Sequence, residues 1–188
     1  MNSLTSKPNP WTIKSSEDGF ENPWIKLTHF KVLNPSGNAA NYTTIHFKNV
    51  SVGVIPLDKN LNTYLVGQYR FPLNRYSWEI PEGGSDQNES PLDTAKRELK
   101  EEAGITANKW KLLQEFDISN SITDEQAFLY VAQDLSFGEA NPDDDEQLEL
   151  KKMPFEELYR LVESGEIRDS LTVVATLKIK NLLLQNKL

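Results

Sequence analysis

The chain has 188 residues and a mass of 21.4 kDa, enough for one domain that buries a core without covalent crosslinks. Its 28 acidic and 20 basic residues give a net charge of −8, which argues against binding nucleic acid or anionic membranes through a basic face. Because the chain contains no cysteine, a disulfide framework, a thiolate nucleophile and a cysteine-ligated zinc site are all excluded.

The N-terminal half is patterned for strands. Residues 1–22 are polar and rich in proline, asparagine and serine, which predicts a mobile arm or a tail that contacts a partner. The segments that follow are enriched in β-branched and aromatic residues, and strands are predicted at 24–32, 42–49, 50–57, 63–70 and 76–80.

A helix is predicted where the apolar period changes from two to 3.6. Ser90 suits the N-cap, Pro91 suits the first helical turn, and Gly104 suits the position just after the helix. Between them, apolar residues recur at spacings of three and four at Leu92, Ala95, Leu99 and Ala103. This stripe predicts that one face of the helix packs against a core.

The remaining chain completes one α/β domain. Further strands are predicted at 111–118, 126–132 and 148–151, and helices at 154–163 and 169–184. We expect residues 1–49 to form an arm and strands that are not an independent domain, and residues 50–188 to form the main domain. With no apolar run that spans a bilayer and no secretory signal, we expect a cytoplasmic protein.

The polar face of the first predicted helix carries three glutamates. Glu98, Glu101 and Glu102 stand at i, i+3 and i+4, so their carboxylates crowd one patch and repel one another. An arbitrary glutamate-rich helix most often presents such a patch to solvent. The alternative is a site for a hard divalent cation, which prefers carboxylate oxygens, water and phosphate.

The wider spacing favours the cation site. The segment GGSDQNESPLDTAKRELKEEAGI resembles the box of the Nudix hydrolase family, Gly-x5-Glu-x7-Arg-Glu-U-x-Glu-Glu-x-Gly-U, where U is a bulky aliphatic residue. The fixed positions are filled by Gly83, Glu89, Arg97, Glu98, Glu101, Glu102 and Gly104, and the aliphatic ones by Leu99 and Ile105. Residues 66–83 and 154–167 resemble the branch of ADP-ribose and nucleoside-diphosphate-sugar pyrophosphatases, so that the resemblance covers about residues 40–184.

The resemblance implies an α/β/α fold, a mixed sheet between helices, here with an N-terminal antiparallel extension. It also implies Mg²⁺ or Mn²⁺ held by Glu98, Glu102 and the backbone carbonyl of Glu82. Glu101 is either a further ligand or the group that activates water, and Glu89 and Arg97 brace the loop. Metal ions suit phosphoanhydride hydrolysis because they neutralise phosphate charge and acidify an attacking water.

A general base in this family commonly comes from a loop after the box. The acidic segment 143–146 offers candidates, of which Glu146 is preferred and Asp144 is second. Arg70, at the end of a predicted strand, suits forked phosphate recognition, and Glu79 is a candidate polar contact to the substrate.

These features predict a divalent-metal-dependent pyrophosphatase that splits a nucleoside diphosphate sugar, such as ADP-ribose or GDP-mannose, into a nucleoside monophosphate and a sugar phosphate. Strict ADP-ribose members carry a proline 16 residues beyond the box, where this chain has Ser121, which favours a broader substrate range. The alternatives are a catalytically silent nucleotide-sugar-binding regulatory module and a hydrolase of capped RNA; the acidic charge disfavours RNA.

The N-terminal strands predict a homodimer. They hold more apolar surface than a compact Nudix core needs, including Trp11, Phe20, Trp24 and Phe30. Exposed apolar surface usually finds a partner, and two-fold dimers are the commonest soluble assembly. The resembled branch is typically dimeric, with the N-terminal segment completing the partner's substrate site.

Overall fold

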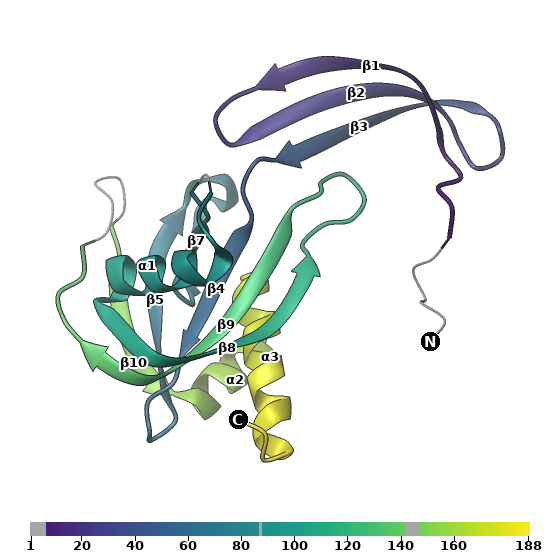
Figure 1. Ribbon diagram of the computed structural model, residues 1–188. Helices are drawn as coiled ribbons and strands as arrows, with labels where there is room; N and C mark the ends of the chain where they lie inside the picture. The colour runs from purple at the N-terminus through teal and green to yellow at the C-terminus, as the bar shows by residue number, and fades with distance from the viewer. Residues whose placement is uncertain (1–6, 87, 142–146) are drawn as a thin grey trace. The chain divides into compact units, whose positions relative to one another are not determined.

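Residues 7–86, 88–141 and 147–188 are described by the computed structural model (Figure 1). The chain divides into two units, one made of Met1–Lys48 with Ser119–Glu125 and the other of Asn49–Ile118 with Gln126–Leu188. The functional division that the sequence predicts, between residues 49 and 50, stays a prediction.

The first unit is built on an antiparallel sheet. Its strands are β1 (Thr12–Glu21), β2 (Ile25–Leu33) and β3 (Ala39–Phe47), in the order β1-β2-β3. The predicted mobile arm over residues 1–22 is therefore wrong for Thr12–Glu21. Every residue of β1 is exposed, so the strand has no buried face and no apolar alternation to reveal it. Backbone pairing with β2 and the ion pair between Lys26 and Asp18, at 2.8 Å, hold it in place.

The second unit contains two sheets (Figure 1). One has the order β7-β4-β9-β8, in which β4 and β9 are parallel and the other pairs antiparallel, and the second is antiparallel with the order β10-β5-β6. The strands are β4 (Ser51–Pro56), β5 (Asn62–Arg70), β6 (Arg75–Glu79), β7 (Glu82–Gly84), β8 (Ile105–Asp117), β9 (Gln126–Phe137) and β10 (Glu149–Pro154), with a 3-10 turn η1 (Phe71–Leu73) between β5 and β6.

Helices cover both faces of these sheets. Helix α1 (Pro91–Ala103) packs Leu99 and Ala95 into one buried cluster with residues of β4, β5 and β9. Helices α2 (Phe155–Glu163) and α3 (Ser170–Leu184) contribute to a second cluster with the opposite faces of these strands. The predicted α/β/α sandwich with an N-terminal antiparallel extension is confirmed.

The predicted boundaries fail mainly at β8 and β9. Strand β8 begins at Ile105 rather than residue 111, and β9 continues to Phe137 rather than ending at residue 132. Exposed polar residues such as Asn108 and Lys109 break the apolar pattern of these stretches. They are held by pairing with each other and by Ile105, Trp110 and Leu135, which belong to or pack against the buried cluster of α1. Among the helices that the structure describes, we find none with the length and apolar character needed to cross a membrane.

Candidate functional site

Helix α1 presents the glutamates from a well-defined frame. The Oγ of its N-cap, Ser90, accepts a hydrogen bond from the Asp93 N–H at 3.2 Å, as the sequence predicts. The helix ends at Gly104, whose φ of 64° lies in the left-handed region that glycine adopts without a steric cost. The carboxylates in the last two turns of α1 therefore project from a rigid support.

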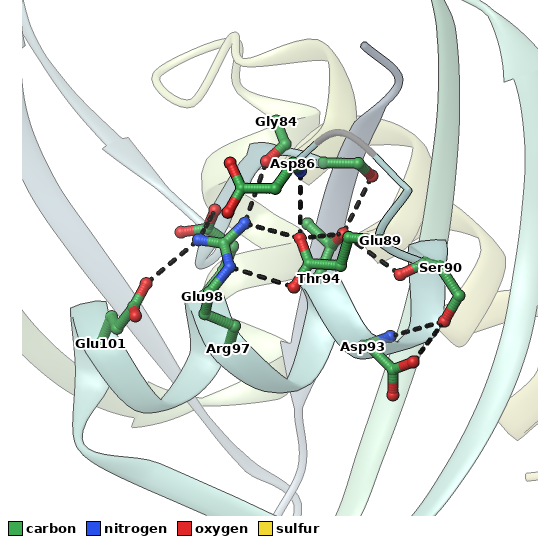
Figure 2. Close-up of polar contacts among 10 residues, drawn as sticks. Gly84, Asp86, Glu89, Ser90, Asp93, Thr94, Arg97, Glu98 and Glu101 are labelled. Carbon is green, nitrogen blue, oxygen red and sulfur yellow. Dashed lines mark hydrogen bonds and ion pairs between the residues drawn. The ribbon is translucent and has the colours of Figure 1, made fainter.

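One group of polar contacts, which we call the Arg97 cluster, joins Gly84, Glu89, Arg97, Glu98 and Glu101 (Figure 2). Arg97 Nε and Nη2 donate to the two oxygens of Glu89 at 3.1 and 3.0 Å. Its Nη1 donates to Glu98 at 2.7 Å and to Glu101 at 3.1 Å, and Nη2 also donates to the Gly84 carbonyl at 3.0 Å. One guanidinium thus contacts three carboxylates and fastens the loop to the helix, although its single charge offsets only one of theirs.

Glu89 closes the loop that precedes α1. Besides Arg97, its Oε2 accepts from the Asp86 N–H at 3.1 Å and from the Thr94 hydroxyl at 2.8 Å (Figure 2). The bond from Arg97 lowers the pKa of Glu89 to about 2, because it favours the carboxylate more strongly than partial burial opposes it. The geometry suits the bracing role that the sequence analysis gives to Glu89 and Arg97.

Gly83 makes room for the Glu98 carboxylate. A Cβ atom at Gly83 would lie 2.1 Å from Glu98 Oε1, so any side chain there would force this carboxylate to move. Glu98 therefore lies directly against the backbone next to Glu82. Glycine is favoured at this place by the close approach of the Glu98 carboxylate, not by an unusual φ angle.

The backbone of Glu82 faces α1. Its N–H donates to Oε2 of the buried Glu102 at 2.8 Å. The Val54 N–H donates to the Pro81 carbonyl at 2.8 Å. Hydrogen-bonded and non-hydrogen-bonded residue pairs alternate along two antiparallel strands, so the next pair of β4 and β7, Gly53 and Glu82, is a non-hydrogen-bonded pair. Because the N–H and C=O of a strand residue point the same way, the Glu82 carbonyl also faces away from β4, on the side of Glu102.

A second group, the Arg70 cluster, consists of Arg70, Glu79, Glu82 and Asp169. Arg70 Nε donates to both oxygens of Glu79 at 3.0 and 2.9 Å, and Nη2 donates to Glu79 at 2.5 Å and to Glu82 at 3.0 Å. Burial would lower the pKa of Arg70, but the bonds and charges of these carboxylates outweigh it and raise that pKa. Arg70 and Glu79, predicted as separate substrate contacts, are thus partners of each other.

The Arg70 cluster holds more negative charge than its arginine neutralises. Oxygen atoms of Glu79, Glu82 and Asp169 lie within 4.8 Å of one another. Burial and these two neighbouring carboxylates raise the pKa of Glu82 well above its ordinary value. Glu82 Oε2 is buried and has no hydrogen-bond partner within residues 7–86, 88–141 and 147–188. A proton or a cation would relieve the repulsion here.

The residues present suit a hard divalent cation. The donors are carboxylates and a backbone carbonyl, the oxygen ligands that Mg²⁺ and Mn²⁺ prefer. The space that a Cβ at Gly83 would fill holds the Glu98 carboxylate beside the Glu82 backbone. In the part of the chain that the structure describes, however, the box glutamates do not form a close group of three carboxylates, since Arg97 holds Glu98 and Glu101 and the Glu82 N–H holds Glu102.

Asp169 is a member of the site that no sequence pattern predicts. Asp169 caps α3, its Oδ2 accepting from the Thr172 N–H at 2.7 Å, and an aspartate at the start of a predicted helix is the available signal for this cap. Nothing in the sequence places it beside Glu82.

The candidate bases Glu146 and Asp144 lie outside the described residues. Asn141 donates its N–H to the Glu101 carbonyl at 2.8 Å, so the chain before that segment is bound to α1.

Comparisons with known proteins agree with this geometry. The NUDIX domain model matches residues 47–172. The chain is 34% identical to a methanol dehydrogenase activator of Bacillus methanolicus over 166 residues, covering 87% of this chain and 89% of the relative. It is also 34% identical to an ADP-ribose pyrophosphatase of Bacillus subtilis (strain 168) over 163 residues, covering 86% and 88%.

The fold comparison extends over nearly the whole chain. A crystal structure described as an ADP compounds hydrolase superposes with a TM-score of 0.85 at 22% identity, covering 98% of this chain and all of the other. A likeness at that identity shows the shared fold. The family model, the relatives at 34% identity and the intact box on α1 together establish that this chain belongs to the NUDIX domain family.

Proposed function

We propose that the protein hydrolyses the pyrophosphate bond of a nucleoside diphosphate sugar, with ADP-ribose as the first candidate and Mg²⁺ or Mn²⁺ as the ion. The observation that carries this proposal is the convergence of Glu98, Glu102 and the Glu82 backbone at the end of one rigid helix. Relatives from Bacillus subtilis and Mycobacterium tuberculosis that bear the name ADP-ribose pyrophosphatase, at 34% and 31% identity, support the substrate class.

In this proposal Glu98, Glu102 and the Glu82 carbonyl hold the metal. A bound divalent ion would supply charge neutralisation at the diphosphate and a lower pKa for the attacking water. Arg97 orients Glu98 and Glu101 by donating to both, which fixes their carboxylates before substrate binds.

The proton of the attacking water needs an acceptor from the protein. Glu101 is the candidate on α1; its side chain is about one third exposed and bound by a single Arg97 contact of 3.1 Å. Glu146 is the candidate from the following loop, with Asp144 behind it. Arg70 is proposed to bind the diphosphate, with Glu79 holding its guanidinium in place through a bidentate ion pair.

The rival function is regulatory. The relative named for activating a methanol dehydrogenase is as similar to this chain as the pyrophosphatase of Bacillus subtilis. Its name supports a second candidate function, in which the protein binds a nucleotide sugar and acts on another protein. A module that only binds a nucleotide sugar does not need the complete set of metal-ligand and bracing residues. The filled box and the fastened Arg97 cluster therefore favour hydrolysis.

A homodimer in the cytoplasm remains part of the proposal. In the first unit, Ile13, Phe20 and Trp24 are each more than half exposed, which supports burial of this sheet against another copy. Light scattering at micromolar concentration should give about twice 21.4 kDa. A monomer mass would contradict the dimer without affecting the hydrolytic proposal.

The decisive experiment is a substrate panel. ADP-ribose, GDP-mannose, other nucleoside diphosphate sugars and capped RNA are each incubated with the full chain, with and without Mg²⁺, and products are separated by chromatography. We expect the products to be a nucleoside monophosphate and a sugar phosphate, and we expect them only when Mg²⁺ is present. Tight binding of a nucleotide sugar without turnover would support the regulatory rival instead.

A further inference from the structure

The turn Ile80-Pro81-Glu82, between β6 and β7, is fastened at three successive residues to three different elements. The Ile80 N–H donates to Thr172 Oγ1 on α3 at 2.9 Å. The Pro81 carbonyl accepts from Val54 on β4 at 2.8 Å, and the Glu82 N–H donates to Glu102 on α1 at 2.8 Å. The position of the Glu82 carbonyl thus depends on all three attachments.

The attachment to α3 is made by a single side-chain oxygen. Thr172 is fully buried in the first turn of α3, and its hydroxyl donates to Asp169 Oδ2 at 2.8 Å. Because a carboxylate can only accept, the hydroxyl proton points to Asp169 and an oxygen lone pair is left for the Ile80 N–H. The direction of both hydrogen bonds is therefore fixed.

Asp169 makes this connection part of the site. Its carboxylate caps α3 through Thr172 and lies in the Arg70 cluster beside Glu79 and Glu82. Thr172 is consequently bound at once to the turn that carries the Glu82 backbone and to a carboxylate that faces the Glu82 side chain.

We propose that Thr172 is a positioning residue, which sets the orientation of the Glu82 carbonyl and so the affinity of the site for its divalent ion. The inference deepens the proposed function and rests on it. A hydroxyl is required because it accepts from Ile80 while donating to Asp169. Valine would fill the same space but would leave the buried Ile80 N–H without its acceptor, and the turn would have to shift to satisfy it.

The same helix offers a matched control. Thr176 lies one turn further along α3 and is also fully buried, but its Oγ1 makes no hydrogen bond to any residue in the described ranges. Thr176→Val therefore makes the same chemical change at the same depth in the core without removing a contact to the turn.

The experiment compares T172V, T172S and T176V in the full chain. Binding of Mn²⁺ is measured by calorimetry without substrate, and kcat and KM are measured at several Mg²⁺ concentrations. T172V should weaken Mn²⁺ binding about 10-fold, the lower end of what residues that orient metal ligands contribute. T172S and T176V should bind Mn²⁺ like the wild type, and saturating Mg²⁺ should restore most of the kcat of T172V.

A lower thermal midpoint for T172V with unchanged Mn²⁺ affinity would overturn the inference, since a merely structural role would give that result. If T172V does not fold, T172C is judged by the same criteria, because a thiol is a much weaker donor and acceptor. Wild-type protein that neither binds Mn²⁺ nor turns over a nucleotide sugar would refute the proposed function itself, whatever the variants do.

Discussion

The Arg97 cluster and the Arg70 cluster are both built on one arginine and several carboxylates, but they are assembled differently. All members of the Arg97 cluster lie between residues 84 and 101, at the end of β7, in the following loop and on α1. The Arg70 cluster takes its members from β5, β6, β7 and the N-terminus of α3, as far apart as residues 70 and 169. Local spacing therefore determines the first cluster, and packing of distant segments determines the second.

The clusters also differ in exposure. The carboxylates that Arg97 contacts are 12–37% exposed, whereas Glu79, the main partner of Arg70, is 2% exposed. Exposed ion pairs contribute little to stability, whereas losing one partner of a buried pair leaves a costly charge. We expect the Arg97 cluster to matter mainly for catalysis and the Arg70 cluster for both catalysis and stability.

The largest loss of turnover is expected from a substitution of Glu102. This residue lies on α1 and accepts a hydrogen bond from the backbone N–H of Glu82, which is a member of the Arg70 cluster. Glu102→Gln should lower kcat about 100-fold or more at saturating Mg²⁺, because a ligand charge is lost while the bond from the Glu82 N–H can persist. Turnover is measured with ADP-ribose, and folding by thermal denaturation.

The control for this prediction is Glu163→Gln, at the exposed end of α2, which should leave turnover unchanged. Near-wild-type kcat for Glu102→Gln would remove Glu102 from the metal ligands.

Exchanging each arginine for glutamine tests the comparison directly. Arg70→Gln should destabilise the fold by about 2–3 kcal/mol, less than a fully buried pair because Arg70 is 35% exposed. Arg97→Gln should cost about 1–2 kcal/mol while still lowering turnover, since its partners, at 12–37% exposed, are more accessible to water than Glu79. Urea denaturation gives both values, and equal losses of stability would erase the distinction between the clusters.

The pH dependence of stability should report on Glu89. Because its pKa is lowered from 4.5 to about 2 in the folded protein, its contribution is complete above pH 4.5 and is lost as the pH falls toward 2. Glu89→Gln should therefore lower stability by on the order of 1–2 kcal/mol at pH 7. The difference from wild type should shrink as the pH approaches 2, as followed by denaturation at each pH; a constant difference would contradict the lowered pKa.

The smallest effect is expected at the helix cap next to the Arg97 cluster. Ser90→Ala removes the side-chain acceptor for the Asp93 N–H and the hydroxyl that donates to Asp93, and should cost ~1 kcal/mol of stability. Because Ser90 contacts neither arginine, kcat should not change. A large loss of activity would show that the start of α1 is coupled to the glutamates at its other end.

The sequence predicts features that depend on neighbouring residues and misses those that depend on contacts between distant segments. The box spacing, the Ser90 cap and the apolar stripe of α1 are local patterns with a known period, and each of them is present in the structure. Strand β1 was missed because all of its residues are exposed, so that only pairing with β2 defines it. The general base stays a prediction, because Glu146 and Asp144 lie outside the described residues.

The sequence by itself determined the family, the fold class and the bracing role of Glu89 and Arg97. The members of that cluster lie close together in the chain, and the helix places Arg97, Glu98 and Glu101 through a fixed rise and rotation per residue. Only the tertiary structure decided that Arg70 pairs with Glu79, that Asp169 lies beside Glu82, and that Thr172 holds the turn before β7. These contacts join residues up to 92 positions apart, and their formation depends on how β5, β6 and α3 pack around a shared core, which no local pattern encodes.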